Sequence, residues 1–508
     1  MKPLLQMAAL LAAGSCAAAD LQPKIGGVAF RFDDNQTTQK WRELGEVFGR
    51  YRAPFGMSLN FARPELDDPA FRAQLLACEA AGCEVMDHTP LHRVFSHTFA
   101  TVEEADKYRD NPAIDHVAGK TVYFKHTVRP EVAAGKLTFA VDGNKVSASP
   151  EVEQLLSREN FVYSLRLGKA FSTRKNQDGS YKLLSYYEED NVDLGRLPPE
   201  EWLVLKRFGA FSVAPDGLRL LAAISRDRAR AAGLKPLKSW ILPGGREGVI
   251  NGREVEDIYG REFGYTSAAT YQDPALRIYN EPDPQRCRFA FQWGSFNLEK
   301  EDVAAVKKKI ADQVARNYVL IGSGHMWVGQ VPGGWDGYLK RHDELLKWCR
   351  EQNIEVRTQS DWVECLYGRK PDPAWNIMPK FETDRDADGV PDGCQLGAGV
   401  GMKSGVLAAG RRGPVFTVNH LSGMERGVNE FAIDCRAAAG TRLVLSWTFF
   451  NRGAETGKGQ STITFAGGDG FEHCRAQVEV PADTTTMTIG MRLENDAAIE
   501  LKNPSFRQ

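Results

Sequence analysis

Short apolar runs alternate with helical patterns from residue 25 onward, and this alternation predicts the central fold. Strands and helices that alternate along a chain are typical of a parallel sheet whose connections are helices. We predict eight strands, which favour an α/β fold, a distorted (β/α) barrel over residues 20–370. Functional side chains of such barrels lie where the strands end. The predicted strands are 25–32, 55–61, 83–88, 239–245, 263–271, 288–294, 318–325 and 354–363, with helices at 69–82, 215–233, 301–317 and 336–352.

Two stretches depart from this alternation. Residues 100–212 alternate polar and apolar positions over short runs that are separated by glycine-containing turns, which predicts a β-rich segment inserted into the barrel. Residues 371–395 hold several prolines and an Asp-rich run, as a linker does. Residues 396–508 then show short strand patterns with Gly turns and little helix, which predicts an all-β sandwich.

The amino terminus has the features of an export signal. One Lys precedes an apolar run at residues 4–13, and small residues follow at 17–19. We therefore expect a signal peptide over residues 1–19 and an exported protein that is periplasmic, secreted or on the cell surface. A lipid anchor at Cys16 stays open, because residues 13–16 loosely resemble a lipobox. No other apolar run reaches the length of a transmembrane helix, so no membrane span is predicted.

The composition indicates a globular protein and excludes some kinds of binding partner. The 508 residues carry 64 basic and 66 acidic side chains, a formal net charge of −2, and 42% are hydrophobic. These values are those of a packed globular protein of about three domains, and they exclude disorder and a basic nucleic-acid binder.

The number of cysteines, nine, bears on whether the protein forms disulfides. Without Cys16 they number eight, an even count that suits disulfides in an oxidising space. Two candidate pairs are Cys435 with Cys474 and Cys349 with Cys365. The absence of a C-x-x-C motif disfavours a cysteine zinc site and a thioredoxin-like role.

Acidic and imidazole side chains follow two of the predicted strands. Asp33 and Asp34 end the first strand, and His88 and His92 follow the third. Two imidazoles four positions apart can face one point if the segment turns helically, and a carboxylate from the neighbouring strand completes a three-ligand metal site. The second Asp is then free to act as a general base on a metal-activated water. An Asp-Asp pair at a strand end and an H-x-x-x-H pattern are each common by chance, but the two together predict a metal centre.

The same residues resemble the motifs of a known family. Arg31-Phe32-Asp33-Asp34-Asn35 is similar to T-F-D-D-G, and His88-Thr89-x-x-His92 matches H-[ST]-x-x-H. These motifs belong to the polysaccharide deacetylases with a NodB homology domain, carbohydrate esterase family 4. The resemblance covers about 25–100 and 213–365. It implies that Asp33 is the base and that Asp34, His88 and His92 hold the metal.

Two weaker matches extend the resemblance. Residues 240–246 are similar to the groove motif R-x-P-Y-G, although the Tyr is missing and the Arg follows the glycines. This match implies an oxyanion-binding groove wall formed by Gly244, Gly245 and Arg246, and we expect Arg246 to reach Asp33 and lower its pKa. Residues 320–325 resemble L-x-L-H, which implies that His325 is the general acid. A structural histidine is the alternative.

The Asp-rich linker resembles the calcium repeats of thrombospondin type 3 linkers. Asp384, Asp386, Asp388 and Asp392 occupy positions 1, 3, 5 and 9 of a calcium loop, with Gly389 at position 6. Position 12 is Gln395, where an EF-hand has Glu. The predicted calcium ligands are Asp384, Asp386, Asp388, Val390 and Asp392, and a solvated acidic linker is the alternative.

These features predict an exported, metal-dependent deacetylase that hydrolyses N-acetyl or O-acetyl groups of a polysaccharide or glycan. Zinc fits two His and one carboxylate best, with cobalt, nickel and manganese open. The alternative is an inactive NodB-like barrel that acts as a glycan-binding or adhesion protein. Trp447, Phe449 and Phe450 share one strand of the sandwich, where aromatic rings either stack on sugars or belong to the core.

Overall fold

The computed structural model describes residues 26–128, 133–137, 140–142, 145–147, 161–164, 169–185, 202–205, 211–243, 252–269, 290–291, 294–367, 376–451 and 454–507. The predicted signal peptide, Cys16 and the groove residues Gly244, Gly245 and Arg246 lie outside these residues. No helix in the described part of the chain is both long and apolar enough to cross a membrane.

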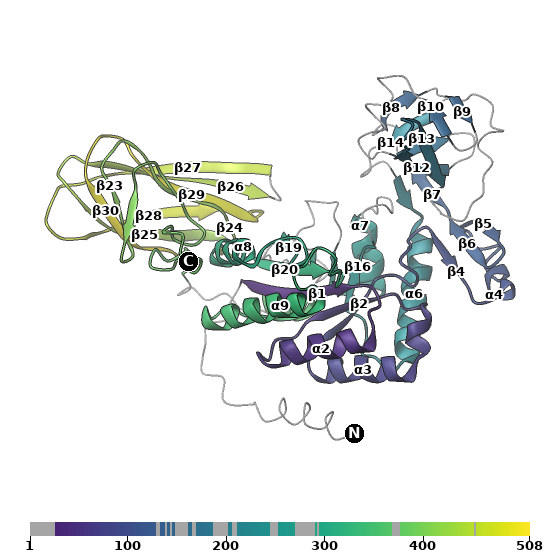
Figure 1. The fold of residues 1–508 in the computed structure, drawn as a ribbon. Helices are drawn as coiled ribbons and strands as arrows, with labels where there is room; N and C mark the ends of the chain where they lie inside the picture. Colours follow the sequence, from purple (N-terminus) through teal and green to yellow (C-terminus); the bar gives the residue numbers. More distant parts are fainter. Residues whose placement is uncertain are drawn as a thin grey trace.

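A curled parallel sheet forms the centre of the first domain (Figure 1). Within the described residues it has eight strands, all paired in parallel. The two edge strands, β18 and β19, are separated by only two residues in the chain, so the two edges lie near each other and the sheet curls towards a barrel. The spatial order is β18 (Ala290–Phe291), β17 (Ser267–Ala269), β16 (Ser239–Ile241), β3 (Glu84–Asp87), β2 (Gly56–Leu59), β1 (Gly27–Asp33), β20 (Val319–Gly324) and β19 (Gly294–Phe296).

Helices connect these strands and cover the sheet. Several begin at caps that are visible in the sequence: Thr37 accepts a hydrogen bond from Lys40 N, and Asp302 accepts one from Ala305 N. The described helices of the barrel are α2 (Thr38–Gly49), η1 (Pro64–Asp67), α3 (Pro69–Ala80), α6 (Pro215–Ala231), α7 (Gly252–Val255), η4 (Glu256–Glu262), α8 (Val303–Ala315), α9 (Gly334–Glu351) and α10 (Gln359–Tyr367). The four predicted helices are present as α3, α6, α8 and α9.

The eighth predicted strand, 354–363, is wrong. Val356 forms only an isolated parallel bridge with Val28, and α10 begins at Gln359. Because β2 pairs with β1 only from Arg31 onward, the start of β1 is open to this bridge. The indole Nε1 of Trp362 then donates to the Val28 carbonyl at 2.9 Å, which anchors α10 at the amino-terminal end of β1.

A buried polar network lies at the starts of β3, β16 and β17. Ser239 Oγ donates to Glu84 Oε1 at 2.5 Å, and Ser360 N donates to Glu84 Oε2 at 3.0 Å. The Ser239 and Ser267 hydroxyls are 2.7 Å apart, and Gln359 Nε2 donates to Ser267 Oγ at 2.8 Å. Burial raises the pKa of Glu84, although its hydrogen bonds oppose the shift. Burial therefore favours a protonated Glu84.

This network predicts a pH-dependent stability that Glu84→Gln removes. A carboxyl whose pKa is raised by folding contributes fully below the unfolded pKa of about 4.5, and the contribution is lost as pH rises to the folded pKa, by about 1.4 kcal/mol per pH unit. The glutamine is neutral throughout, can accept from Ser360 N and can donate to Ser239. We therefore expect the free energy of unfolding of Glu84→Gln to increase relative to that of the wild type as pH rises from about 4.5. Urea unfolding of both proteins in the presence of a chelator measures this difference. A pH-independent difference would contradict the assignment.

The β-rich insertion lies between β3 and α6, on the side of the barrel away from the sandwich (Figure 1). Its base is an antiparallel sheet of β4 (Ser96–Thr98), β6 (Thr121–Phe124) and β5 (Ile114–Ala118) beside α4 (Val102–Asp106). A ribbon of β7 (His126–Val128) and β15 (Phe211–Val213) leads to a second sheet. That sheet is ordered β8 (Ala133–Leu137), β14 (Trp202–Leu205), β11 (Phe161–Ser164), β12 (Lys169–Lys175), β13 (Tyr181–Ser185), β10 (Lys145–Ser147) and β9 (Ala140–Asp142).

Two antiparallel sheets form the carboxy-terminal sandwich. The first is ordered β21 (Gln395–Leu396), β24 (Gly413–Leu421), β29 (Thr486–Leu493), β26 (Arg442–Asn451) and β27 (Ala454–Thr464). The second is ordered β22 (Gly401–Lys403), β23 (Val406–Ala409), β30 (Ile499–Arg507), β25 (Gly427–Ala437) and β28 (Glu472–Val480). The sandwich is tied to the barrel, because Tyr318 Oη donates to the His420 carbonyl at 2.6 Å and Asn317 Nδ2 to the Ser422 carbonyl at 2.9 Å.

The structure of the sandwich bears on the predicted aromatic residues and on the candidate disulfide. Phe449 is buried in the core, and Trp447 packs over Gly459 of the neighbouring strand and against the same core. Cys435 and Cys474 lie on the adjacent strands β25 and β28, in diagonal register. No disulfide joins the cysteines within the described residues.

Candidate active site

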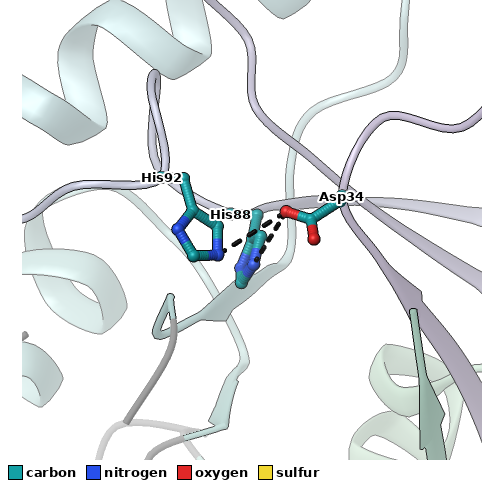
Figure 2. Close-up of side chains that lie close together, drawn as sticks. All are labelled: Asp34, His88 and His92. Carbon is teal, nitrogen blue, oxygen red and sulfur yellow. Dashed lines mark ion pairs between the residues drawn. The ribbon is translucent and has the colours of Figure 1, made fainter. Parts of the chain in front are cut away.

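Asp34, His88 and His92 come together at the carboxyl ends of β1 and β3 (Figure 2). Each offers one ligand atom, and these atoms all lie within 4.8 Å of one another. Asp34 Oδ1 is 3.7 Å from His88 Nε2 and 3.5 Å from His92 Nε2. The two rings are nearly perpendicular, at 77°, with centroids 4.8 Å apart. The structure therefore brings the three predicted metal ligands to one point.

The backbone that presents these groups is a strained turn rather than the helical turn expected over 88–92. Asp34, Thr89 and His92 have φ angles of 71°, 63° and 61°, in the left-handed region that non-glycine residues rarely adopt. Hydrogen bonds hold the turn, since Thr89 N donates to Asp87 Oδ1 at 2.9 Å and Arg93 N to Thr89 Oγ1 at 3.0 Å. Strain of this kind concentrates at functional sites.

His88 is prepared to bind a cation. Its Nδ1 lies 3.0 Å from the Ile241 carbonyl, which fixes the ring and, with Nδ1 protonated, leaves the Nε2 lone pair free. Nε2 is buried and has no hydrogen-bond partner among the described residues. Burial holds the pKa of His88 well below its ordinary value, so the imidazole is neutral at pH 7. A buried, neutral and unpartnered nitrogen that faces a carboxylate and a second imidazole fits a metal ligand.

The donor set fits zinc. Two imidazole nitrogens and one carboxylate oxygen make a three-ligand site that leaves a coordination position for water. His92 and Asp34 keep about a third of their side chains exposed, at 32% and 31%. The centre is therefore open to solvent and substrate on the side of these two residues.

Asp33 lies beside the cluster as part of a buried ion pair. Arg31 Nε donates to Asp33 Oδ1 at 2.9 Å and Arg31 Nη2 to Oδ2 at 3.2 Å, and both side chains are almost fully buried. Burial pushes the pKa of Asp33 upward, but the positive charge and hydrogen bonds of Arg31, together with the nearby imidazoles of His88 and His325, hold the pKa below its ordinary value. Asp33 is therefore an ionised carboxylate that can accept a proton.

Arg31 lowers the pKa of Asp33, and the expected contact of Arg246 with Asp33 lies outside the described residues. Phe30 and Phe32 pack against Phe48 and His342 on the helix side of β1, so Arg31 and Asp33 share the opposite face. An ionisable residue within the apolar run, two positions before Asp33, is the signal that could have found this pair. The groove and oxyanion assignment of Gly244, Gly245 and Arg246 stays a prediction.

His325 follows β20 directly, next to the end of β1 in the sheet. The backbone N–H groups of His325 and Trp327 both donate to Oε1 of the buried Glu299. The backbone carbonyl of His325 accepts a hydrogen bond from Gln36 Nε2 at 3.0 Å. Gln36 Nε2 also lies 3.3 Å from the Asp33 carbonyl, so one side chain ties the two strand ends together. The imidazole of His325 contributes to lowering the pKa of both Asp33 and His92. Glu299 and Gln36 belong to no motif, so no local pattern in the sequence identifies them.

The Asp-rich linker forms a second carboxylate cluster. Asp384, Asp386 and Asp388 have oxygens within 4.8 Å of one another, and the ammonium of Lys308 on α8 contacts Asp386 and Asp388. Asp392 instead pairs with Arg385 at 2.7 Å, and the Val390 N–H donates to Asp388 Oδ1 at 2.8 Å. The linker thus has a cationic partner from the barrel, and calcium stays a prediction.

No protein-family model matches the chain, and no curated protein matches it in sequence. Three solved structures show remote likenesses. The Xyl-CE4 domain of a multidomain xylanase from the hindgut metagenome of Trinervitermes trinervoides has 8% identity and a TM-score of 0.27, over 67% of this chain and 90% of that one.

Two likenesses each cover about a quarter of this chain. The CBM22-1 and GH10 modules of xylanase 10B from Clostridium thermocellum have 11% identity and a TM-score of 0.19, over 23% of this chain and 26% of that one. The CBM22-1 xylan-binding domain of Paenibacillus barcinonensis Xyn10C has 14% identity and a TM-score of 0.19, over 25% of this chain and 90% of that one. These values assign no family.

Proposed function

We propose that the chain is an exported, metal-dependent deacetylase that hydrolyses N-acetyl or O-acetyl groups of a polysaccharide or other glycan. The observation that carries this proposal is the buried, unpartnered Nε2 of His88, which faces Asp34 and His92. Asp34, His88 and His92 would hold a divalent cation, zinc first among the candidates. When bound, such a cation polarises an acyl carbonyl and acidifies water.

The residues around the cluster supply the proton transfers. Asp33, held ionised by Arg31, accepts a proton from the water whose oxygen adds to the acyl carbon. His325 gives a proton to the nitrogen or oxygen of the sugar as the acyl bond breaks, so that acetate and a free amine or hydroxyl are released. Gln36 holds the strand ends that carry the base and the acid. Gly244 and Gly245 are the predicted source of an N–H for the oxyanion.

The glycan as substrate is supported by the order of the two motifs along the chain. Export rests on the signal-peptide pattern of residues 1–19, with a lipid anchor at Cys16 as its variant. Within this proposal the sandwich is an accessory module. Calcium bound by Asp384, Asp386 and Asp388 would compete with Lys308 for the same carboxylates.

Removal and return of the metal test the proposal. Protein stripped with a chelator should release no acetate from N-acetylated and O-acetylated oligosaccharides, and one equivalent of zinc should restore the release. Cobalt, nickel and manganese in parallel rank the metals. Acetate release that survives stripping would contradict metal dependence. Zinc binding without acetate release across the glycan panel would favour the inactive, glycan-binding alternative.

A further inference from the structure

An exposed aromatic ring lies beside the candidate acid. Trp327 follows His325 by two residues, in the loop between β20 and α9, and it is 61% exposed. Every other tryptophan whose burial the structure describes is buried or half-buried. Burying the large apolar surface of an indole stabilises a protein, so an exposed one in a packed domain needs a reason.

The ring is presented by a rigid backbone. Trp327 N donates to Glu299 Oε1 at 3.2 Å, and the same oxygen accepts from His325 N. Between them Met326 is 1% exposed, has a φ of 56°, and accepts a hydrogen bond from Lys40 Nζ at 3.2 Å through its carbonyl. A left-handed, buried methionine that is fastened on both sides holds the next side chain outward.

One face of the indole is already occupied. The rings of His325 and Trp327 are stacked, with centroids 4.4 Å apart and an angle of 23° between their planes. Because Trp327 as a residue is 61% exposed, the other face is open to solvent. The apolar C–H face of a pyranose fits such a surface, and the indole N–H at its rim can bond a hydroxyl.

The surroundings match a sugar better than a protein or a membrane. The other large hydrophobic residues that are exposed in the described part of the chain, Leu76, Val102 and Val428, lie on α3, α4 and β25. Protein and membrane partners need a contiguous apolar patch of several hundred Å². An isolated ring beside polar groups has the size of one sugar unit.

The stacking distance shows whether a sugar on Trp327 can be the unit that reacts. A pyranose on the free face lies about 4 Å from the indole. Added to the 4.4 Å between the rings, this places the sugar about 8 Å from the imidazole of His325. Proton transfer needs a separation of about 3 Å. A sugar stacked on Trp327 is therefore not the unit that His325 protonates.

We propose that Trp327 is a binding subsite for a second sugar unit of the substrate, next to the unit that loses its acyl group. This inference rests on the proposed function for the identity of the reacting unit. It makes the substrate class an oligosaccharide or polysaccharide rather than a free monosaccharide.

Binding and turnover of pentamers and monomers test the subsite. Wild type, Trp327→Ala, Trp327→Phe and the control Leu76→Ala are titrated by calorimetry in chelator with pentamers of N-acetylglucosamine and of O-acetylated xylose. Trp327→Ala should bind its pentamer about tenfold more weakly, whereas Trp327→Phe retains a ring and should lose less. Leu76→Ala should bind as the wild type does. With zinc, the ratio of kcat/KM for pentamer over monosaccharide should fall about tenfold in Trp327→Ala.

The outcomes separate this inference from the proposed function. If the wild type releases acetate and Trp327→Ala changes neither pentamer affinity nor the kcat/KM ratio, the subsite is wrong and the deacetylase stands. If pentamer binding depends on Trp327 but no acetate is released, the subsite stands and the deacetylase fails. A wild type that binds neither pentamer overturns the subsite.

Discussion

His88→Ala is expected to abolish metal retention and to lower acetate release to the background rate while the protein stays folded. The variant loses the ligand whose Nε2 faces Asp34 and His92, and two ligands remain where three were available. Metal affinity should fall by about 100-fold or more, because removing even an outer-shell partner costs up to that much. Metal content after gel filtration and acetate release at saturating zinc measure the two effects.

His342→Ala is the matched control for this substitution. His342 is 2% exposed, its Nδ1 lies 2.9 Å from the Tyr338 carbonyl, and burial lowers its pKa to about 4, as at a buried structural histidine. It packs among Phe30, Phe32 and Phe48 on the helix side of β1. The control should lose stability and keep its metal. Equal metal loss in both variants, or full metal retention in His88→Ala, would overturn the assigned centre.

Asp33→Asn is expected to lower turnover by about 10²- to 10⁴-fold, the usual contribution of a general base, with the metal retained. The amide cannot accept the proton from water, whereas the three metal ligands are unchanged. This combination of bound metal and lost turnover separates a base from a ligand. Metal content and kcat on the same protein sample decide it. Loss of metal in Asp33→Asn would make Asp33 a ligand instead.

The buried ion pair complicates this substitution and also provides its control. Removing the carboxylate that Arg31 holds by two hydrogen bonds should cost about 3–5 kcal/mol, since Arg31 is 1% exposed. Arg31→Met combined with Asp33→Asn removes both charges and should recover much of the unfolding free energy. Its turnover should remain as low as that of Asp33→Asn. Recovered turnover in the double variant would mean that Asp33 acts through stability alone.

The order of residues along the chain predicts most barrel elements and the positions of the metal ligands. Strand and helix periods differ, so short apolar runs and amphipathic stretches locate seven of the eight predicted strands and the four predicted helices. Asp34 and His88 could be assigned to one edge of a sheet because parallel strands end at the same edge. That reasoning needs only the order of residues along the chain.

Tertiary contacts decided the rest. Residues 354–363 include apolar residues that suit either a strand or a helix. In the curled sheet the two edge positions are taken by β18 and β19, and residues 359–367 form the helix α10. Arg31 forms a buried ion pair with Asp33, and Glu299 holds the loop that carries His325. Such partners are distant in sequence or carry no motif. The free energy of a buried charge depends on which donors surround it in space, and a local pattern does not contain that information.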